Sequence, residues 1–349
     1  MPRSQSRPAA RPAAPRRERR RPERAAAPRR TRRRSERPAA PRRARRGPER
    51  ATVLPIAALR AARTAAALAL LLLLAPALLA REDAGEAIAR GDAAWNRRAE
   101  GHVGAHASPG PIGEAIAAYE QALKQQPERL EVYWKLLRAQ HYKGDFVAMT
   151  REQKQAVFGP ARSIAEAGLD LLARKVGGRE RLDAMSPAAA AKALAGVPEA
   201  APLHLWAGIH WGLWGDNFGR LAAARQGVGD RLRRYSEVVI AIDERFEHAG
   251  GHRLLGRLHT LAPKVPFLTG WVDRDKAVVE LRRAVALAPD YPLNAVFLAE
   301  ALLEYQPAHA AEARQLLRAV VARPPDPERP VEDEDAIARA RALLAKHPG

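Results

Sequence analysis

One spacing of small, large and proline residues recurs along this chain and restricts what it can fold into. In the stretches EAIAAYEQALKQQP and KAVVELRRAVALAP, alanine, a large residue, alanine and proline follow one another at steps of four, three and five. Steps of three and four keep side chains on one helix face, alanine lets a second helix approach closely, and proline ends the helix. The spacing therefore predicts closely packed helix pairs. The predicted packing residues are Ala115, Tyr119, Ala122 and Pro127, and Ala277, Leu281, Ala284 and Pro289.

The rest of the chain after residue 80 carries the same helical signal. Apolar residues recur at spacings of three and four, no stretch alternates with period two, and Gly and Pro separate the periodic stretches. A partial third copy of the spacing occupies Ala313, Leu317, Val320 and Pro325. The spacing is typical of the second helix of a tetratricopeptide repeat. The expected fold class is all-α, a tetratricopeptide-like helical repeat bundle or solenoid over residues 81–349.

The tryptophan-rich stretch LHLWAGIHWGLWGDN, residues 203–217, fits the same template. Its Gly-Asp pair aligns with the Gly-Asp pair of HYKGDF at Gly144, and each pair is expected to form the turn that leads into the next helix. The alignment puts Ala207 and Gly208 at the close-approach positions and Trp211 at the large buried position. We therefore predict a repeat helix here.

A second face of that helix is the candidate binding site. Trp206, His210 and Trp214 stand at i, i+4 and i+8, which places them on one face of a helix. Together with Asp216 and Asn217 they are predicted to line a groove for a small organic ligand, because aromatic walls with a few polar groups suit such a molecule. The alternative is that the stripe packs against the following helix, and the sequence leaves both open.

Two histidine pairs have the spacing of metal ligands on a helix. His248 and His252 stand four residues apart, as do His102 and His106. The two glycines between the first pair are expected to form a turn, and the second pair lies in a stretch rich in Gly and Pro. Because no third ligand is evident, we predict no metal site and no other cofactor.

Catalytic motifs do not stand out in this chain. It contains no Gly-rich phosphate loop, no H-E-x-x-H and no G-x-S-x-G. An enzymatic interpretation has only His204, His210 and Asp216 to support it. We therefore predict a protein that is not an enzyme and that binds partners through its helical surface.

The first fifty residues form a tail of unusual composition. Residues 1–50 hold twenty Arg, no Lys and four Glu, and so carry +16 of the chain's formal net charge of +20. They contain no Ile, Leu, Val or aromatic residue, so they cannot bury enough apolar surface to offset the entropy of ordering. The tail is predicted to be disordered. No aromatic residue is interleaved for base stacking, so no specific nucleic-acid partner is expected.

Residues 51–80 carry a membrane signal. Thr64 to Ala80 is seventeen residues long without a charge, and Arg60 and Arg63 precede it. This stretch is predicted to be a helix that acts either as a signal peptide or as a transmembrane anchor. Since basic flanks stay cytoplasmic, later residues are expected in the periplasm or cell envelope. The chain has no Cys, which excludes a lipoprotein anchor.

The order of these stretches resembles the TRAP transporter TatT component family, whose members are divergent tetratricopeptide-like bundles. The resemblance spans most of residues 86–321 and rests on GDAAWNRR, YWKLLRAQHYKGDF, LHLWAGIHWGLWGDNFGRLAA, GGHRLLGRLHTLAP and DKAVVELRRAVALAPDYPLNAVFLAE. It implies an extracytoplasmic, usually membrane-anchored accessory component that contacts the solute-binding protein of a TRAP-type importer. With the predicted groove, the leading expectation is such a component that also contacts a small organic ligand. Many members are lipoproteins, from which this chain departs. The alternative is a generic membrane-tethered tetratricopeptide scaffold for protein–protein interaction.

Overall fold

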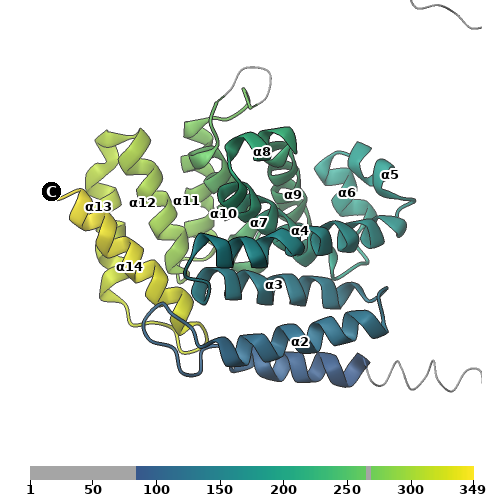
Figure 1. Ribbon diagram of the computed structural model, residues 1–349. Coiled ribbons are helices and arrows are strands. Elements are labelled where there is room, and N and C mark those ends of the chain that lie inside the picture. The colour runs from purple at the N-terminus through teal and green to yellow at the C-terminus, as the bar shows by residue number, and fades with distance from the viewer. Residues whose placement is uncertain (1–83, 265–268) are drawn as a thin grey trace, which may run out of the picture. The chain divides into compact units, whose positions relative to one another are not determined.

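A computed structural model describes residues 84–264 and 269–349 of the chain (Figure 1). All of them belong to one compact unit. The predicted disordered tail and hydrophobic helix lie outside the described residues. No helix among the described residues is long and apolar enough to cross a membrane.

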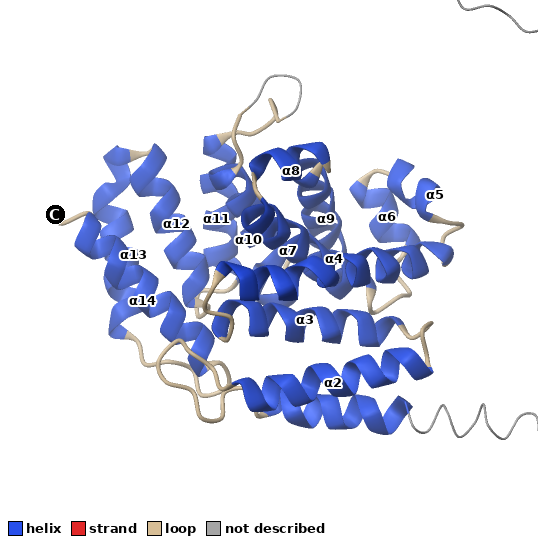
Figure 2. Ribbon diagram, in the orientation of Figure 1, coloured by secondary structure: helices blue, strands red, loops and turns tan. Residues whose placement is uncertain are grey.

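The described residues are built from helices, and their only strand-like feature is an isolated bridge between Val103 and His106 (Figure 2). The all-α prediction is confirmed for this part of the chain. A helical segment at residues 84–96 comes first. The later helices are α2 Pro109–Gln125, α3 Leu130–Phe146, α4 Arg151–Arg174, α5 Arg179–Ala184, α6 Pro187–Ala193, α7 Ala200–Phe218, α8 Arg220–Arg225, α9 Val228–Ile242, α10 Phe246–Leu261, α11 Arg274–Leu287, α12 Pro292–Tyr305, the 3-10 turn Pro307–His309, α13 Ala310–Ala322 and α14 Pro330–Lys346.

Helices that follow one another in the chain pack side by side. Contacts run from α2 to α3, α3 to α4, α4 to α7, α7 to α9, α9 to α10, and then pairwise through α11, α12, α13 and α14. Figure 1 shows this succession from α2 at the bottom to α14 at the left. The short helices α5, α6 and α8 pack against α4, α9 and both α7 and α9, respectively. The described residues therefore form an array of stacked helix pairs.

The residues of the recurrent spacing lie where helices meet. All six of its alanines and large residues have 0% exposure, namely Ala115, Tyr119, Ala122, Ala277, Leu281 and Ala284. Pro127 and Pro289 stand two positions beyond the last residues of α2 and α11. Proline cannot continue a helix, so it marks the helix end.

The Gly-Asp turns that the sequence suggested are not turns. Helix α3 continues through Gly144 to Phe146, and α7 continues through Gly215 to Phe218. A Cβ added at Gly144 would lie 2.1 Å from Cζ of Phe158, so glycine is needed there to admit an aromatic ring from α4. The small residue marks a close helix approach, and a local pattern cannot distinguish that role from a turn.

The glycines between His248 and His252 are also helical rather than a turn. Gly250 and Gly251 are buried in α10, and a Cβ at Gly250 would lie 2.8 Å from Cδ2 of Leu205. The break in the helix comes just before them, at residues 247–249, whose φ values are 49°, 57° and 60°. Three successive residues other than glycine therefore adopt the left-handed conformation.

Candidate ligand-binding cavity

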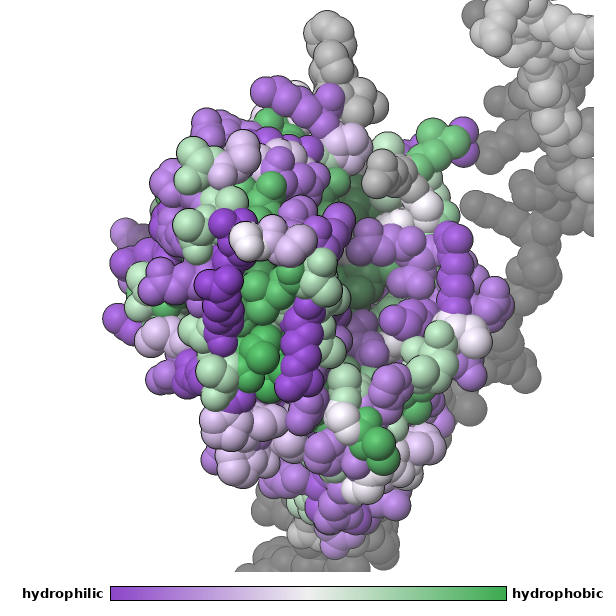
Figure 3. All heavy atoms as spheres, turned by 90° about the vertical axis from the view of Figure 1, so that its left-hand side faces the viewer, coloured by the Kyte–Doolittle hydropathy of each residue, from purple (hydrophilic) through white to green (hydrophobic). Residues whose placement is uncertain are grey.

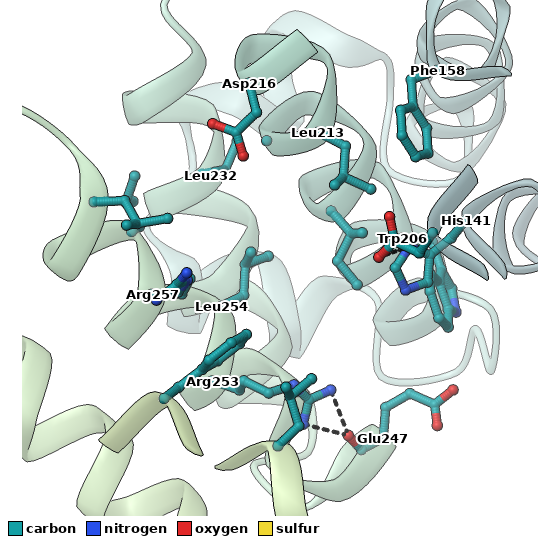
Figure 4. A pocket seen from close by; sticks show the side chains of 18 of the residues that line it. His141, Phe158, Trp206, Leu213, Asp216, Leu232, Glu247, Arg253, Leu254 and Arg257 are labelled. Atoms are coloured by element: carbon teal, nitrogen blue, oxygen red, sulfur yellow. Dashed lines mark hydrogen bonds and ion pairs between the residues drawn. The ribbon is translucent and has the colours of Figure 1, made fainter. Parts of the chain in front are cut away.

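A cavity of about 1340 Å³ lies among α3, α7, α9, α10, α12 and the start of α14. Its walls join residues as distant in the sequence as Trp95 and Arg339. Figure 3 looks toward a hollow in the surface, where green apolar residues lie deeper than the purple polar residues around it. Figure 4 shows the side chains of Trp206, Leu213, Leu254 and Arg253 around the open space.

Helices α7 and α10 form the apolar wall of the cavity. They run in the same direction, because a Cβ at Gly250 would meet Leu205 at 2.8 Å and one at Gly208 would meet Leu254 at 2.7 Å. Each contributes a stripe with steps of three or four residues, which keeps it on one helix face. The six stripe residues all line the cavity: Trp206, Ile209 and Leu213 on α7, and Leu254, Leu258 and Leu261 on α10.

Three of the five residues predicted to bind a ligand line this cavity: Trp206, Asp216 and Asn217. Trp206 is 7% exposed, and its ring lies 5.4 Å from the ring of His141 on α3. Its Nε1 has no hydrogen-bond partner among the described residues. The side chain of Asn217 donates to the carbonyl of Leu213 at 2.8 Å.

His210 and Trp214, the other two residues of the predicted stripe, do not line the cavity. His210 has 0% exposure and its Nε2 lies 2.8 Å from the carbonyl oxygen of Leu137. Burial lowers the pKa of His210 to about 3, so the ring is neutral at pH 7 and Nε2–H donates to that carbonyl. Trp214 stacks on Phe218 with ring centroids 5.2 Å apart. The stripe is divided because α3, α4, α9 and α10 cover different sides of α7.

Trp211, which the repeat alignment assigned to packing, is 3% exposed. Its Nε1 donates to Oε1 of Glu166 at 2.6 Å, and the guanidinium groups of Arg162 and Arg231 lie over its ring at 5.1 Å and 4.7 Å. Ala207, next to the close-approach glycine, has 0% exposure. These residues bind α7 to α4 and α9.

The residues behind the enzymatic interpretation are not brought together at the cavity. His204 is 3% exposed and its Nδ1 lies 2.7 Å from the carbonyl oxygen of Ala200, one turn earlier in the same helix. Burial lowers its pKa to about 4. Neither His204 nor His210 lines the cavity, whereas Asp216 does.

The left-handed turn at residues 247–249 forms one edge of the cavity, and two other segments hold it in place. Arg253 donates to the carbonyls of Glu247 at 3.2 Å and His248 at 3.0 Å, as the dashed lines to Glu247 in Figure 4 indicate. The buried Asn294 of α12 donates to the carbonyl of His248 at 3.1 Å. Left-handed residues other than glycine cost roughly 1–2 kcal/mol each, so these bonds offset a strained backbone at the cavity wall.

Arginine side chains stacked on aromatic rings line the remaining walls. Arg253 lies 4.6 Å from the ring of Tyr291, and Arg257 lies 4.4 Å from the ring of Phe297 and pairs with Glu300 at 2.6 Å. Stacking holds each guanidinium in one orientation beside the cavity.

A second stacked pair lies at the α3 side of the cavity. Arg98 and Arg138 lie 4.6 Å and 4.0 Å from the ring of Trp95. Burial lowers the pKa of Arg138, whose Nε has no hydrogen-bond partner within the described chain. Sequence reasoning missed these arginines. The i, i+4 spacing of Arg253 and Arg257 beside an apolar stripe is the only signal that could have found two of them.

The histidines of the first pair with metal-ligand spacing, His248 and His252, face different partners. His248 stacks on Tyr291 with ring centroids 4.5 Å apart, whereas Nδ1 of His252 lies 2.6 Å from a carboxylate oxygen of Glu280. Within the described ranges, no group of three or more His, Cys, Asp or Glu residues could hold a metal ion.

No protein-family model matches this chain, and no curated protein matches it. Among solved structures, the chain is similar to TTC0263, a thermophilic TPR protein of Thermus thermophilus. The two chains are 18% identical, the match covers 68% of this chain and 92% of that one, and the TM-score is 0.43. The architecture described above therefore rests on this chain's own helices and contacts.

Proposed function

We propose that this chain is a tetratricopeptide-like binding protein, not an enzyme, which takes a small organic ligand into the cavity between α7 and α10. One observation carries the proposal. Ile209, Leu213 and Leu254 are only partly buried although they line a cavity of about 1340 Å³ walled by aromatic-stacked arginines. A ligand that covers these apolar side chains gains their transfer free energy, and the surrounding polar groups orient it.

The partner we propose is the solute-binding protein of a TRAP-type importer, in line with the resemblance to the TatT component family. The stretches that carry this resemblance meet at the cavity. Trp206 comes from LHLWAGIHWGLWGDN, Arg253 from GGHRLLGRLHTLAP and His141 from YWKLLRAQHYKGDF, and all three line it. This convergence supports a role for the motif residues in binding rather than in packing alone.

The proposed location is the periplasm or cell envelope, reached through the hydrophobic stretch at residues 64–80. The charge-free length of that stretch and the two arginines before it support export. A generic tethered scaffold that binds another protein is the second candidate, and it is favoured by the array of stacked helix pairs alone.

Native mass spectrometry of the full-length protein purified from its source tests the ligand site. We expect a bound small molecule in the wild type and its loss in Leu213→Glu, since a carboxylate at that position is placed against the apolar stripes. Leu221→Glu is the matched control, because Leu221 is 67% exposed on α8 and does not line the cavity. Equal retention of the molecule in both variants would place the ligand elsewhere.

The partner is tested separately by calorimetric titration with a TRAP solute-binding protein encoded beside this gene. Saturable binding supports the transporter role. The scaffold function would be favoured if the solute-binding protein does not bind and another protein encoded nearby binds without any small molecule.

A further inference from the structure

We infer that the ligand is a single-chain acyl amphiphile, whose hydrocarbon chain lies between the stripes of α7 and α10 and whose oxygen-bearing head lies beside Arg138, His141 and Trp206. The inference rests on the proposed function, since it names the class of molecule that the cavity takes. Two independent features lead to it: the shape of the apolar wall and the chemistry at one end of it.

The apolar wall follows the axes of two helices, α7 and α10. From Leu254 to Leu261 the axis of α10 advances about 10 Å, at about 1.5 Å per residue. The stripe of α7 runs beside it in the same direction, from Trp206 to Leu213, and none of the six stripe residues carries a charge. Leu261 at the far end is 45% exposed. A wall of this form matches an extended hydrocarbon chain better than a compact polar solute.

Two hydrogen-bond donors without a partner line the cavity beyond the apolar stripes, and Trp206, at the start of the α7 stripe, carries one of them. Nε1 of Trp206 and Nε of Arg138 are donors that find no acceptor among the described residues, and both residues line the cavity. Trp206 is more than nine-tenths buried. His141 follows Arg138 by one turn on α3, its ring lies 5.4 Å from the Trp206 ring, and its Nδ1 lies 3.6 Å from a carboxylate oxygen of Asp145. Groups that can only donate call for a ligand rich in acceptor oxygens.

The charge of Arg138 is not neutralised by an ion pair with any described carboxylate. Its guanidinium instead lies over the rings of Trp95 and Trp134, at 4.0 Å and 5.0 Å from their centroids. Glu247 is the carboxylate whose field reaches it. An acyl carbonyl therefore suits this end whether it belongs to a carboxylate or to an uncharged ester, and the two sources are separated by experiment.

Calorimetric titration of the full-length protein with sodium alkanoates, from hexanoate to hexadecanoate below their micelle concentrations, tests the chain. Each added methylene that enters the cavity should raise affinity by about fourfold. The rise should stop once the chain is longer than the wall. Affinity that does not depend on chain length, or that rises without limit to hexadecanoate as in bulk partitioning, would overturn the inference.

Leu213→Trp gives a second measure that loss of folding cannot imitate. The larger ring fills the end of the wall, so affinity should stop rising at a shorter chain while the shortest alkanoates bind as before. Leu221→Trp, outside the cavity on α8, should leave the whole series unchanged. An identical length limit in Leu213→Trp and wild type would contradict the assigned path of the chain.

Arg138→Met tests the head. It should weaken every alkanoate by about tenfold while keeping the increment per methylene, because a hydrogen bond to a charged donor is lost and the apolar wall is unchanged. Methyl esters of the same acids identify the source: equal affinity indicates an ester head, and about tenfold weaker binding indicates a carboxylate. An unchanged affinity in Arg138→Met would show that the head group of the ligand does not lie beside Arg138.

The two proposals fail in different ways. If alkanoates and esters do not bind but native mass spectrometry shows a molecule that Leu213→Glu loses, the ligand class is wrong and the cavity is still the binding site. If neither assay shows binding, the proposed ligand-binding function fails as well.

Discussion

Helices α11 and α13 belong to the same array of stacked helix pairs as helices α7 and α10. The first two helices bury different kinds of side chain from the second two. The buried side chains of α11 and α13 are all apolar, among them Ala277, Leu281 and Leu317. Those of α7 and α10 include histidines, such as His210 and His252, and the close-approach glycines. The first pair shows what regular packing alone requires. The second pair shows which departures from regular packing accompany a cavity.

The buried histidines of α7 and α10 depend on polar partners. His210 needs the carbonyl of Leu137, and His252 needs Glu280. A buried polar group that loses its partner costs free energy, whereas an apolar contact weakens gradually. The stability of the cavity region therefore depends on the protonation of its buried histidines, whereas the regular helices α11 and α13 bury no histidine and should not respond to pH in this way.

Acidification should lower the free energy of unfolding more than any other change proposed below. The loss should come from the buried histidines of α7. The pKa of His210 is lowered to about 3 and that of His204 to about 4, against an ordinary value of 6.5, in both cases by burial. Between those values and 6.5 the unfolded chain binds more protons than the folded one. Stability is therefore complete above pH 6.5 and is lost as pH falls, by about 2 kcal/mol per histidine at pH 5.

Urea unfolding at pH 7 and pH 5 measures this loss. His210→Gln should reduce the difference between the two pH values by about 2 kcal/mol. His106→Gln, at an exposed position, controls for the removal of a histidine. Equal wild-type stability at both pH values would contradict the proposed difference between α7 and the helices without buried histidine.

The contact between α10 and α11 joins the cavity region to the regular helices, and Gly256→Ala tests it. A Cβ there would lie 2.6 Å from Cγ of Leu281 and 3.2 Å from the carbonyl oxygen of Ala277, so α10 and α11 must separate. We expect a loss of about 2 kcal/mol in unfolding free energy. Gly113→Ala in α2, where nothing lies within 4 Å of an added Cβ, should instead stabilise by about 0.5–1 kcal/mol. Losses of equal size in both variants would argue against close packing at the junction.

Replacing alanine by glycine should have the smallest effect on stability. The sign of that effect should differ between the left-handed turn of α10 and the regular helix α11. Ala249→Gly should stabilise by at most about 1 kcal/mol, because glycine adopts the φ of 60° without strain and this gain exceeds the loss of a buried methyl group. Ala284→Gly in the regular helix α11 should destabilise by at least about 1 kcal/mol, from helix propensity and the lost methyl group. Thermal unfolding of the two variants measures both. Destabilisation by Ala249→Gly would show that the left-handed turn is not strained.

Periodicity was enough to predict the helical class and the positions at which helices approach one another. Ala115 and Ala284 could be placed on packed faces because that signal depends only on spacing along one helix. The Gly-Asp pairs were misassigned as turns, since a glycine that admits Phe158 has the same local sequence as one that ends a helix. Of the five predicted ligand residues, the structure keeps Trp206, Asp216 and Asn217 at one cavity.

What the sequence alone determined is therefore the all-α class and the tryptophan-rich helix as the place of interest. Only the tertiary structure decided which side of α7 is open, because five other helices, α3, α4, α8, α9 and α10, determine which of its faces are covered. It also produced the left-handed turn at residues 247–249, which opposes local backbone preference and depends on Arg253 and Asn294. Local propensity acts over a few residues, whereas the cavity depends on contacts between residues more than a hundred positions apart.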